Sequence, residues 1–354
     1  MREVVDVINA PSFVSVSEGL DDIYTSMKQW FSSREIAFDN IIRSRVYLTD
    51  PANQLEVVRS HALYADVLSR GAFSYVGQPL LNGAKVAVMF VVDLDSKAVK
   101  RGSPDKMIVA SGETEAFYHS VRLRDEEAVG LTARQQTEMI FARHIEWLEA
   151  NGMTLKDNCV RTWLFVRDID RNYADVMRGR NAVFEKEGLT ADTHYIASTG
   201  IGGYMAQTQP VVAIDFFSVK DKCLAPRYLN ALEYLNHTHE YGVAFERGVK
   251  VNAFGDEKVY ISGTASIDKF GKCLFVGDVK RQTDRLFLNI SQLLADAGRT
   301  LNDIAYMVVY LRDVADVKFL NDYVEKHFPT VPCVVVKADV CRPQWLVEVE
   351  CVAK

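Results

Sequence analysis

A twelve-residue segment that occurs three times constrains the fold of this chain more than any other feature. It reads DNIIRSRVYLTD at Asp39–Asp50, DNCVRTWLFVRD at Asp157–Asp168 and NDIAYMVVYLRD at Asn302–Asp313. In each copy an acidic or amide pair precedes a run of strand-forming residues, and an aspartate closes the run. Apolar residues at helical spacing follow each copy. Three such copies predict an internal three-fold molecule, with sites where one copy meets the next.

The composition limits the class of protein. The 354 residues are 48% hydrophobic and 25% charged, which suffices for two or three domains. The formal net charge of −6 argues against nucleic acid as the main partner, although a local cluster of arginines would suffice for small anions. Six cysteines without CxxC or metal-ligand spacing indicate reduced thiols. No apolar run approaches the ~20 residues that cross a bilayer, and MREVVDVINAPSF lacks a signal-peptide pattern. We therefore expect a cytoplasmic protein with no membrane partner, metal or cofactor.

The second and third copies are the more complete ones. Each opens with a β-branched run that ends in Ser-Gly, a bulge or turn signal, at Met107–Thr114 and Val259–Ser266. We expect a helix to start at Thr137 and at Thr283, with the threonine as its N-cap. The repeated strand, a second helix and a final strand pair complete the unit.

The first copy has a first helix and a closing strand, KVAVMFVVDL, but no evident opening strands. Polar stretches near 97–106 and 220–250 are the expected linkers. The predicted units are a degenerate unit lacking opening strands and two fuller ones, at 1–97, 98–222 and 223–354. The order ββ-α-β-α-ββ predicts an α+β fold of mixed sheets with helices on one face. Packing three such sheets around a shared axis, as an internal pseudo-trimer, would bury their other faces.

These features resemble a known superfamily. The third copy resembles the RidA (YjgF/YER057c/UK114) superfamily through ISGTASID, the Gly277-Asp278 pair, the helix end DAGRTLNDI and the terminal VEVECVA. Single-unit members of that superfamily form homotrimers with sites at the subunit junctions. The whole chain resembles the chorismatase branch, through these motifs in order: GQPLLNG, RGRNAVF, ASTGIGG, YGVAF, SGTASI and VCRPQWLVEVE.

Glu348 is the leading catalytic candidate. It lies in WLVEVEC, an expected core strand, and shares a face with Glu350 at roughly 6–7 Å. Burial and a nearby like charge would raise its pKa and leave a protonated acid at neutral pH. The alternative is an edge strand whose glutamates face solvent.

The resemblance implies a reaction for this site. Chorismatases cleave the enol-ether side chain of chorismate, so Glu348 would protonate the enolpyruvyl methylene, water or a ring hydroxyl would trap the cation, and pyruvate would leave. Cys341 and Gly263 occupy positions that separate product subtypes, and both resemble the subtype that releases a hydroxybenzoate. The alternative for Cys341 is a small buried side chain.

Arginines would bind the two carboxylates of such a substrate, because their forked donors match carboxylate oxygens. The candidates are Arg161, Arg180, Arg247 and Arg342, and a surface ion pair is the alternative for each. In ASTGIGG, Thr199 and Gly200 belong to a Gly-rich turn that offers backbone N–H groups, although a bulge is the alternative. Tyr241 would cap the pocket or pack at its rim.

Two departures keep other functions open. RidA-type imine hydrolases carry an arginine before the penultimate strand, where this chain has Val331 in copy three and His194-Tyr195 in copy two. Chorismatases carry a His-containing segment after SGTASI, where this chain has DKFGKCLFVGD. The alternatives are therefore an enamine or imine hydrolase and a non-catalytic protein that binds small carboxylates. Three internal copies predict a monomer or a low-order homo-oligomer.

Overall fold

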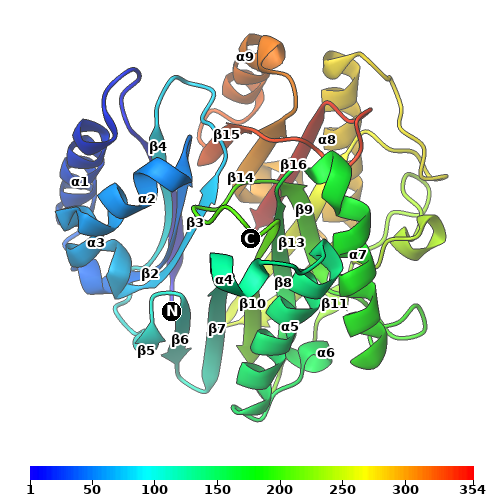
Figure 1. Ribbon diagram of the computed structural model, residues 1–354, viewed down its shortest axis with the longest axis horizontal. Helices are drawn as coiled ribbons and strands as arrows, with labels where there is room; N and C mark the ends of the chain where they lie inside the picture. Colours follow the sequence, from blue (N-terminus) through cyan, green and yellow to red (C-terminus); the bar gives the residue numbers. More distant parts are fainter.

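A computed structural model describes the chain from Met1 to Lys354, except for the side chain of Tyr241 (Figure 1). Within the described residues the strands form three sheets. The first sheet has the order β1-β4-β2-β3, the second β5-β6-β7-β10-β8-β9 and the third β11-β12-β13-β16-β14-β15. The strands of each sheet come from one continuous stretch of chain, 3–93, 99–220 or 227–353.

The strands have these bounds: β1 Glu3–Asn9, β2 Ile41–Leu48, β3 Ala72–Gly77, β4 Val86–Asp93, β5 Val99–Ser103, β6 Lys106–Ser111, β7 Thr114–Val121, β8 Cys159–Val166, β9 Ala197–Gly202, β10 Val212–Lys220, β11 Arg227–Tyr228, β12 Gly248–Ala253, β13 Asp256–Ala265, β14 Ile304–Leu311, β15 Cys333–Lys337 and β16 Val347–Ala353. The α-helices have these: α1 Val16–Ser32, α2 Pro51–Ser60, α3 Ala62–Asp66, α4 Asp125–Ala128, α5 Ala133–Glu149, α6 Leu155–Asn158, α7 Ile169–Lys186, α8 Val279–Asp296 and α9 Val317–His327.

The repeated segment forms the same strand in every sheet. As β2, β8 and β14, it pairs in parallel with the strand that follows its helix (β3, β9 or β15) and antiparallel with the closing strand (β4, β10 or β16). This mixed pairing confirms the α+β prediction. The helices lie at the periphery and the sheets face one another in the middle of the molecule (Figure 1).

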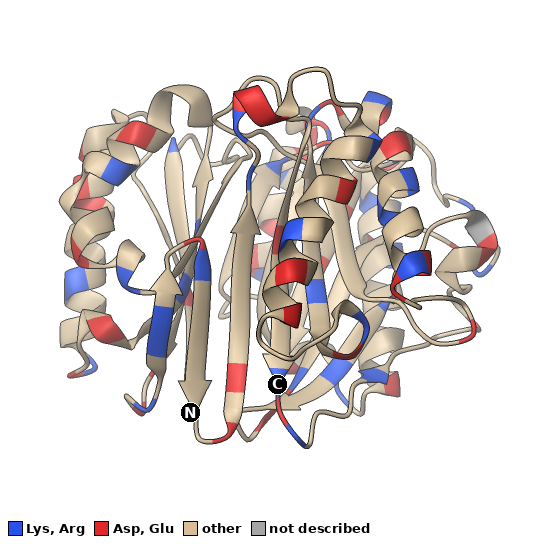
Figure 2. Cartoon of the chain, turned by 60° about the horizontal axis from the view of Figure 1, so that its bottom comes forward, with Lys and Arg blue, Asp and Glu red and all other residues tan. Residues whose placement is uncertain are grey.

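Alternation along the strands explains this packing. In β8, Leu164 and Val166 join the core under α5 and α7, whereas Trp163 and Phe165 join the larger core shared with the other two sheets. Successive side chains point to opposite faces of a strand, so each sheet buries one face under helices and the other against its neighbours. This arrangement is the predicted pseudo-trimer. Charged residues of both signs are spread along the helices (Figure 2).

The opening strands differ from the prediction. The first sheet does have an opening strand, β1, which pairs with β4 along Glu3–Asn9. The prediction missed it because acidic residues interrupt its β-branched run, and none of its side chains is fully buried. The stretch Met107–Thr114 is a hairpin rather than one strand, because Gly112 turns the chain with a φ of +63°. In Val259–Ser266 the same Ser-Gly signal marks a bulge within β13. The expected linker at 97–106 contains β5, an edge strand paired with β6.

The predicted N-caps are also wrong. Helix α5 starts four residues earlier, capped by Thr132, and α8 is capped by Asp278. Thr137 and Thr283 lie inside the helices, where each hydroxyl donates to the carbonyl four residues earlier at 2.7 Å and 2.8 Å. Among the described residues, no helix has both the length and the apolar character needed to cross a bilayer.

Candidate active site

A cavity of about 40 Å³ lies where the second and third sheets meet. Strand β9 joins β13 there: the Ser198 N–H donates to the Ser262 hydroxyl, and the Gly263 N–H donates to the Thr199 hydroxyl, both at 2.9 Å. The cavity is lined from both units, by Tyr173, Arg180, Ser198, Gly200, Val243, Phe245, Arg247, Gly263, Ala265, Ile267, Cys341, Arg342, Trp345 and Glu348. Seven of the ten residues proposed from the sequence therefore line one cavity.

Glu348 is the carboxyl group of this cavity. It lies in β16, opposite Tyr310 of β14 and Ala265 of β13, and is 4% exposed. Burial, and then the negative charge of Glu350, raise its pKa to about 8, although Arg161 lowers it in part. At neutral pH the carboxyl is therefore mostly protonated. The alternative of solvent-facing glutamates does not hold, because Glu350 is also buried, at 5% exposure.

Gly263 gives the Glu348 carboxyl its space. A Cβ at this position would overlap Oε1 of Glu348 and would lie 3.1 Å from Cγ2 of Thr199. Glycine at this position thus leaves room for the carboxyl group of a side chain from the neighbouring strand.

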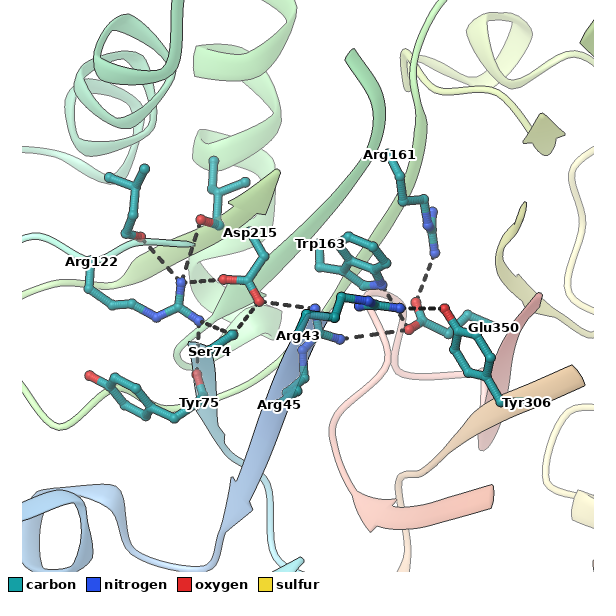
Figure 3. A network of polar contacts seen from close by, with 12 residues as sticks. Arg43, Arg45, Ser74, Tyr75, Arg122, Arg161, Trp163, Asp215, Tyr306 and Glu350 are labelled. Carbon is teal, nitrogen blue, oxygen red and sulfur yellow. Dashed lines mark hydrogen bonds and ion pairs between the residues drawn. The ribbon is translucent and has the colours of Figure 1, made fainter. Parts of the chain in front are cut away.

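Glu350 is held by a network that crosses between the sheets (Figure 3). Arg161 donates to its Oε2 at 2.8 Å and the Trp163 indole N–H donates to its Oε1 at 2.8 Å. Arg45 from the first sheet lies between Glu350, at 4.0 Å, and Asp215 of the second sheet, at 2.9 Å. Figure 3 shows Arg122 on the far side of Asp215, and these two residues are 2.5 Å apart. Arg45, Arg161 and the largely buried Arg122 thus compensate the two buried carboxylates, as charges in a core require.

Arg161 is consequently not placed to bind substrate. Its guanidinium faces Glu350 and also donates to the Thr199 hydroxyl and, at 3.3 Å, to the Ser262 hydroxyl. It does not line the cavity. Thr199 likewise faces Arg161 and Gly263 rather than the cavity.

The other three predicted arginines do line the cavity. Arg180 comes from α7 and is 2% exposed, and Arg247 is 6% exposed and donates to the Asn236 carbonyl at 3.2 Å. Arg342 is partly exposed, with its guanidinium 5.1 Å from the Trp345 ring. Together they place positive charge around the protonated Glu348.

The Gly-rich segment forms β9 rather than an anion-binding turn. Gly200 and Gly202 allow close packing, since a Cβ would lie 3.1 Å from the Tyr173 ring at one and 2.9 Å from the Asp339 backbone at the other. Tyr241 was expected to cap the pocket, but its side chain lies outside the described residues. Among the described residues, no group of three or more His, Cys, Asp or Glu side chains could hold a metal ion.

Cys341 lines the cavity as a neutral thiol. Burial and the charge of Glu348 raise its pKa to about 12, despite a hydrogen bond with Tyr173 that lowers it. A thiol in this state is a poor nucleophile at neutral pH, so Cys341 shapes the cavity rather than attacking a substrate.

Several residues that line the cavity were not among those predicted from the sequence. Tyr173 belongs to the apolar stripe of α7, five residues after the aspartate that ends the repeated segment, and Trp345 lies inside the motif VCRPQWLVEVE. Their spacing is that of ordinary core residues, so only the folded structure shows that they line the same cavity as Glu348.

Comparisons with known proteins identify a family match within the third unit and relatives that cover smaller or larger shares of the chain. The family described as Endoribonuclease L-PSP matches residues 242–354. A RutC family protein of Pyrococcus abyssi is 31% identical over 111 residues, which are 31% of this chain and 84% of that protein. The 3-aminoacrylate deaminase RutC of Acinetobacter baylyi is 31% identical over 100 residues, which are 28% of this chain and 79% of that protein.

Two further matches extend beyond the third unit. The 3-hydroxybenzoate synthase of Streptomyces hygroscopicus is 26% identical over 243 residues, covering 61% of this chain and 68% of that protein. A crystal structure of chorismatase superimposes with a TM-score of 0.67 at 17% identity, covering 89% of this chain and 93% of that one. Over most of its length the chain therefore has the fold of that chorismatase.

Proposed function

Because the chain belongs to the RidA (YjgF/YER057c/UK114) superfamily and has the fold of a chorismatase over most of its length, we propose that it cleaves the enolpyruvyl ether of chorismate. The products would be pyruvate and a hydroxybenzoate or a dihydroxycyclohexadiene carboxylate. One observation carries the proposal: a buried, protonated carboxyl, Glu348, lies in a cavity lined by three arginines.

Glu348 is the proposed general acid. Its proton passes to the methylene carbon of the enol ether, which leaves an oxocarbenium-like centre on the adjacent carbon. A carboxyl with an ordinary pKa would be ionised at neutral pH, whereas a pKa of about 8 keeps the proton available. The low exposure of the site keeps bulk water from competing for that proton.

Water adds its oxygen to the cationic carbon and passes a proton to the Glu348 carboxylate, which forms a hemiketal and restores the acid. Glu348 then protonates the ring oxygen as the C–O bond between that oxygen and the hemiketal carbon breaks, and the hemiketal O–H returns its proton to Glu348, so that pyruvate and a ring alcohol leave. Where a ring hydroxyl reacts instead, its oxygen attacks the ring carbon that carries the ether and loses a proton to Glu348, and pyruvate leaves from that ring carbon. A neutral Cys341 beside Glu348 would influence which oxygen reaches the cation by the space it occupies.

Arg180, Arg247 and Arg342 are proposed to bind the two substrate carboxylates. Two of them are buried, where a charged hydrogen bond to a carboxylate is strong because little water competes. Val243, Phe245, Ala265, Ile267 and Trp345 supply an apolar wall for a carbon ring.

One observation favours a second candidate, a protein that binds a small carboxylate without converting it. The cavity of about 40 Å³ is far smaller than the roughly 300–1,000 Å³ of typical ligand pockets, so chorismate enters only if lining side chains move. An imine hydrolase is less well supported, because the positions expected for the RidA arginine hold Val331 in the third unit and His194-Tyr195 in the second.

Incubation with chorismate tests the proposal. Pyruvate release and identification of the ring product are measured for the wild type, for Glu348→Gln, and for Glu325→Gln, an exposed glutamate of α9, as the control. We expect release in the wild type and the control and a loss of at least about a hundredfold in Glu348→Gln. Saturable binding of chorismate by calorimetry without pyruvate release would favour the second candidate instead.

A further inference from the structure

The internal three-fold creates a second junction like the one that holds Glu348. The catalytic cavity lies where β9 of the second sheet meets β13 of the third. In the same way, β3 of the first sheet meets β7 of the second. Strands β3 and β9 hold the same place in their sheets, beside the repeated strand, and β7 and β13 both pair with the closing strand.

This second junction also has a cavity, of about 370 Å³. In both cavities the helix or helices after the repeated strand supply an arginine and a tyrosine. These are Arg180 and Tyr173 from α7 in one cavity, and Arg59 of α2 and Tyr64 of α3 in the other. The two cavities thus share a plan as well as a position.

The second cavity lacks the catalytic acid. Phe165 of β8 and Tyr310 of β14 hold the same position in the repeated segment. Tyr310 pairs with Glu348 and Phe165 pairs with Ala213, so an alanine stands where the third sheet has the glutamate. The least exposed charged group that lines this cavity is Arg122, whose side chain is 9% exposed and ion-paired with Asp215. Among the described residues that line this cavity the carboxyl group is that of Asp105, which is exposed, so no buried carboxyl there could donate a proton as Glu348 is proposed to do.

The residues that line this second cavity favour an anion that carries an aromatic ring. The cavity is lined by three arginines, Arg59, Arg122 and Arg124, and by one carboxylate, Asp105, although the net charge of the chain is −6. Arg59 and Arg124 have exposed side chains whose ion pairs, with Glu56 and with Glu126 and Glu127, lie at 3.1–3.3 Å. Aromatic surface comes from Tyr64 and Phe73, whose rings meet edge to face at 5.0 Å, and from Tyr75.

We propose that this second cavity is a non-catalytic binding site for a small aromatic carboxylate. The carboxylate would be bound by Arg59 and Arg124, which line the cavity from the first and the second unit and carry forked donors. The ring would lie against Tyr64 and Phe73. The proposal is independent of the activity assigned to Glu348.

Titration with benzoate tests the site, because benzoate has both the ring and the carboxylate but no enol ether. Binding is measured by calorimetry at low ionic strength, where exposed arginines act most strongly. We expect Arg59→Gln and Arg124→Gln each to raise the Kd about tenfold, since each removes a charged donor. Both side chains are exposed, at 45% and 68%, so the variants should fold.

Two further variants sharpen the test. Arg227→Gln removes an arginine of similar exposure, 52%, that does not line the cavity, and should leave the Kd unchanged. Asp105→Asn removes the opposing carboxylate and should tighten binding several-fold. The proposal is overturned if benzoate does not bind saturably, if the Kd is indifferent to Arg59 and Arg124, or if Asp105→Asn weakens binding.

Discussion

At the residue scale, the protonation of Glu348 links stability to pH. Its pKa is raised from 4.5 to about 8 in the folded chain, so between these values the folded state holds a proton that the unfolded state has lost. The stabilisation from this proton is complete below pH 4.5 and is lost as the pH rises to about 8.

We therefore expect Glu348→Gln, which stays neutral, to gain stability relative to the wild type as the pH rises from 5 to 8. The gain should be on the order of 1 kcal/mol per pH unit within that window. Urea midpoints of both proteins at pH 5, 6.5 and 8 measure it. A difference that does not vary with pH would mean that Glu348 is ionised in the folded protein.

Gly263 offers a test of how tightly the acid is positioned. In Gly263→Ala the new methyl group occupies the place of Oε1 of Glu348, and a flexible side chain gives way more easily than the backbone. We expect the carboxyl to be displaced, with pyruvate release reduced at least about tenfold and stability lowered by only about 1 kcal/mol. Assays of activity and thermal unfolding on the same preparation separate the two effects; unchanged activity would contradict this position for Glu348.

At the scale of the element, β16 presents two carboxyl groups on one face in different surroundings. Glu350 is charge-compensated by Arg161 and Arg45, whereas Glu348 faces the cavity. Glu350→Gln removes the like charge, so the pKa of Glu348 should fall, although burial, the larger cause of the shift, remains.

The expected result for Glu350→Gln is a pH–rate profile whose basic limb moves below pH 8, with unfolding easier by about 3–5 kcal/mol because buried arginines lose a partner. Profiles of kcat/KM between pH 5 and 9 measure the limb, and Glu325→Gln serves as the exposed control. A lower rate with an unshifted limb would show that Glu350 acts through stability alone.

The elements also show which features can be predicted from the sequence. The repeated strands and the shared face of Glu348 and Glu350 can be predicted, because the alternation of side chains and the preference of β-branched residues for strands depend only on residues close together in the sequence. Strand β1 was missed because Glu3 and Asp6 interrupt its apolar run, and Thr137 was misassigned as a cap because threonine also bonds inside helices. Arg161 was wrongly predicted to bind the substrate, because its partner Glu350 lies 189 residues away in the sequence. Contacts between residues so far apart in the sequence depend on how the sheets pack together, and the size of the cavity depends on the same packing. Neither can be predicted from local sequence pattern.

At the scale of the whole molecule, the sheets share one core rather than three. The largest apolar cluster draws residues from all of them, including Val88 of the first, Phe165 of the second and Val349 of the third. The ion-pair network crosses the same interfaces, with Asp215 of the second sheet bound to Arg45 of the first. A unit that separated from the others would expose an apolar face and buried charges together, so the units should unfold together.

Asp215→Asn tests this cooperativity. It leaves Arg45 and Arg122 without a full countercharge in the core, and we expect a loss of about 3–5 kcal/mol. Asp192→Asn, at an exposed aspartate, should change stability by less than about 0.5 kcal/mol. Two variants, each with one tryptophan, allow the first and the third unit to be followed separately by fluorescence. One keeps Trp30 and the other keeps Trp345, and the remaining tryptophans are replaced by phenylalanine. Because the network joins the first sheet to the others, both probes should report the same lowered midpoint, whereas a first unit that merely rests on its neighbours would unfold in a transition of its own.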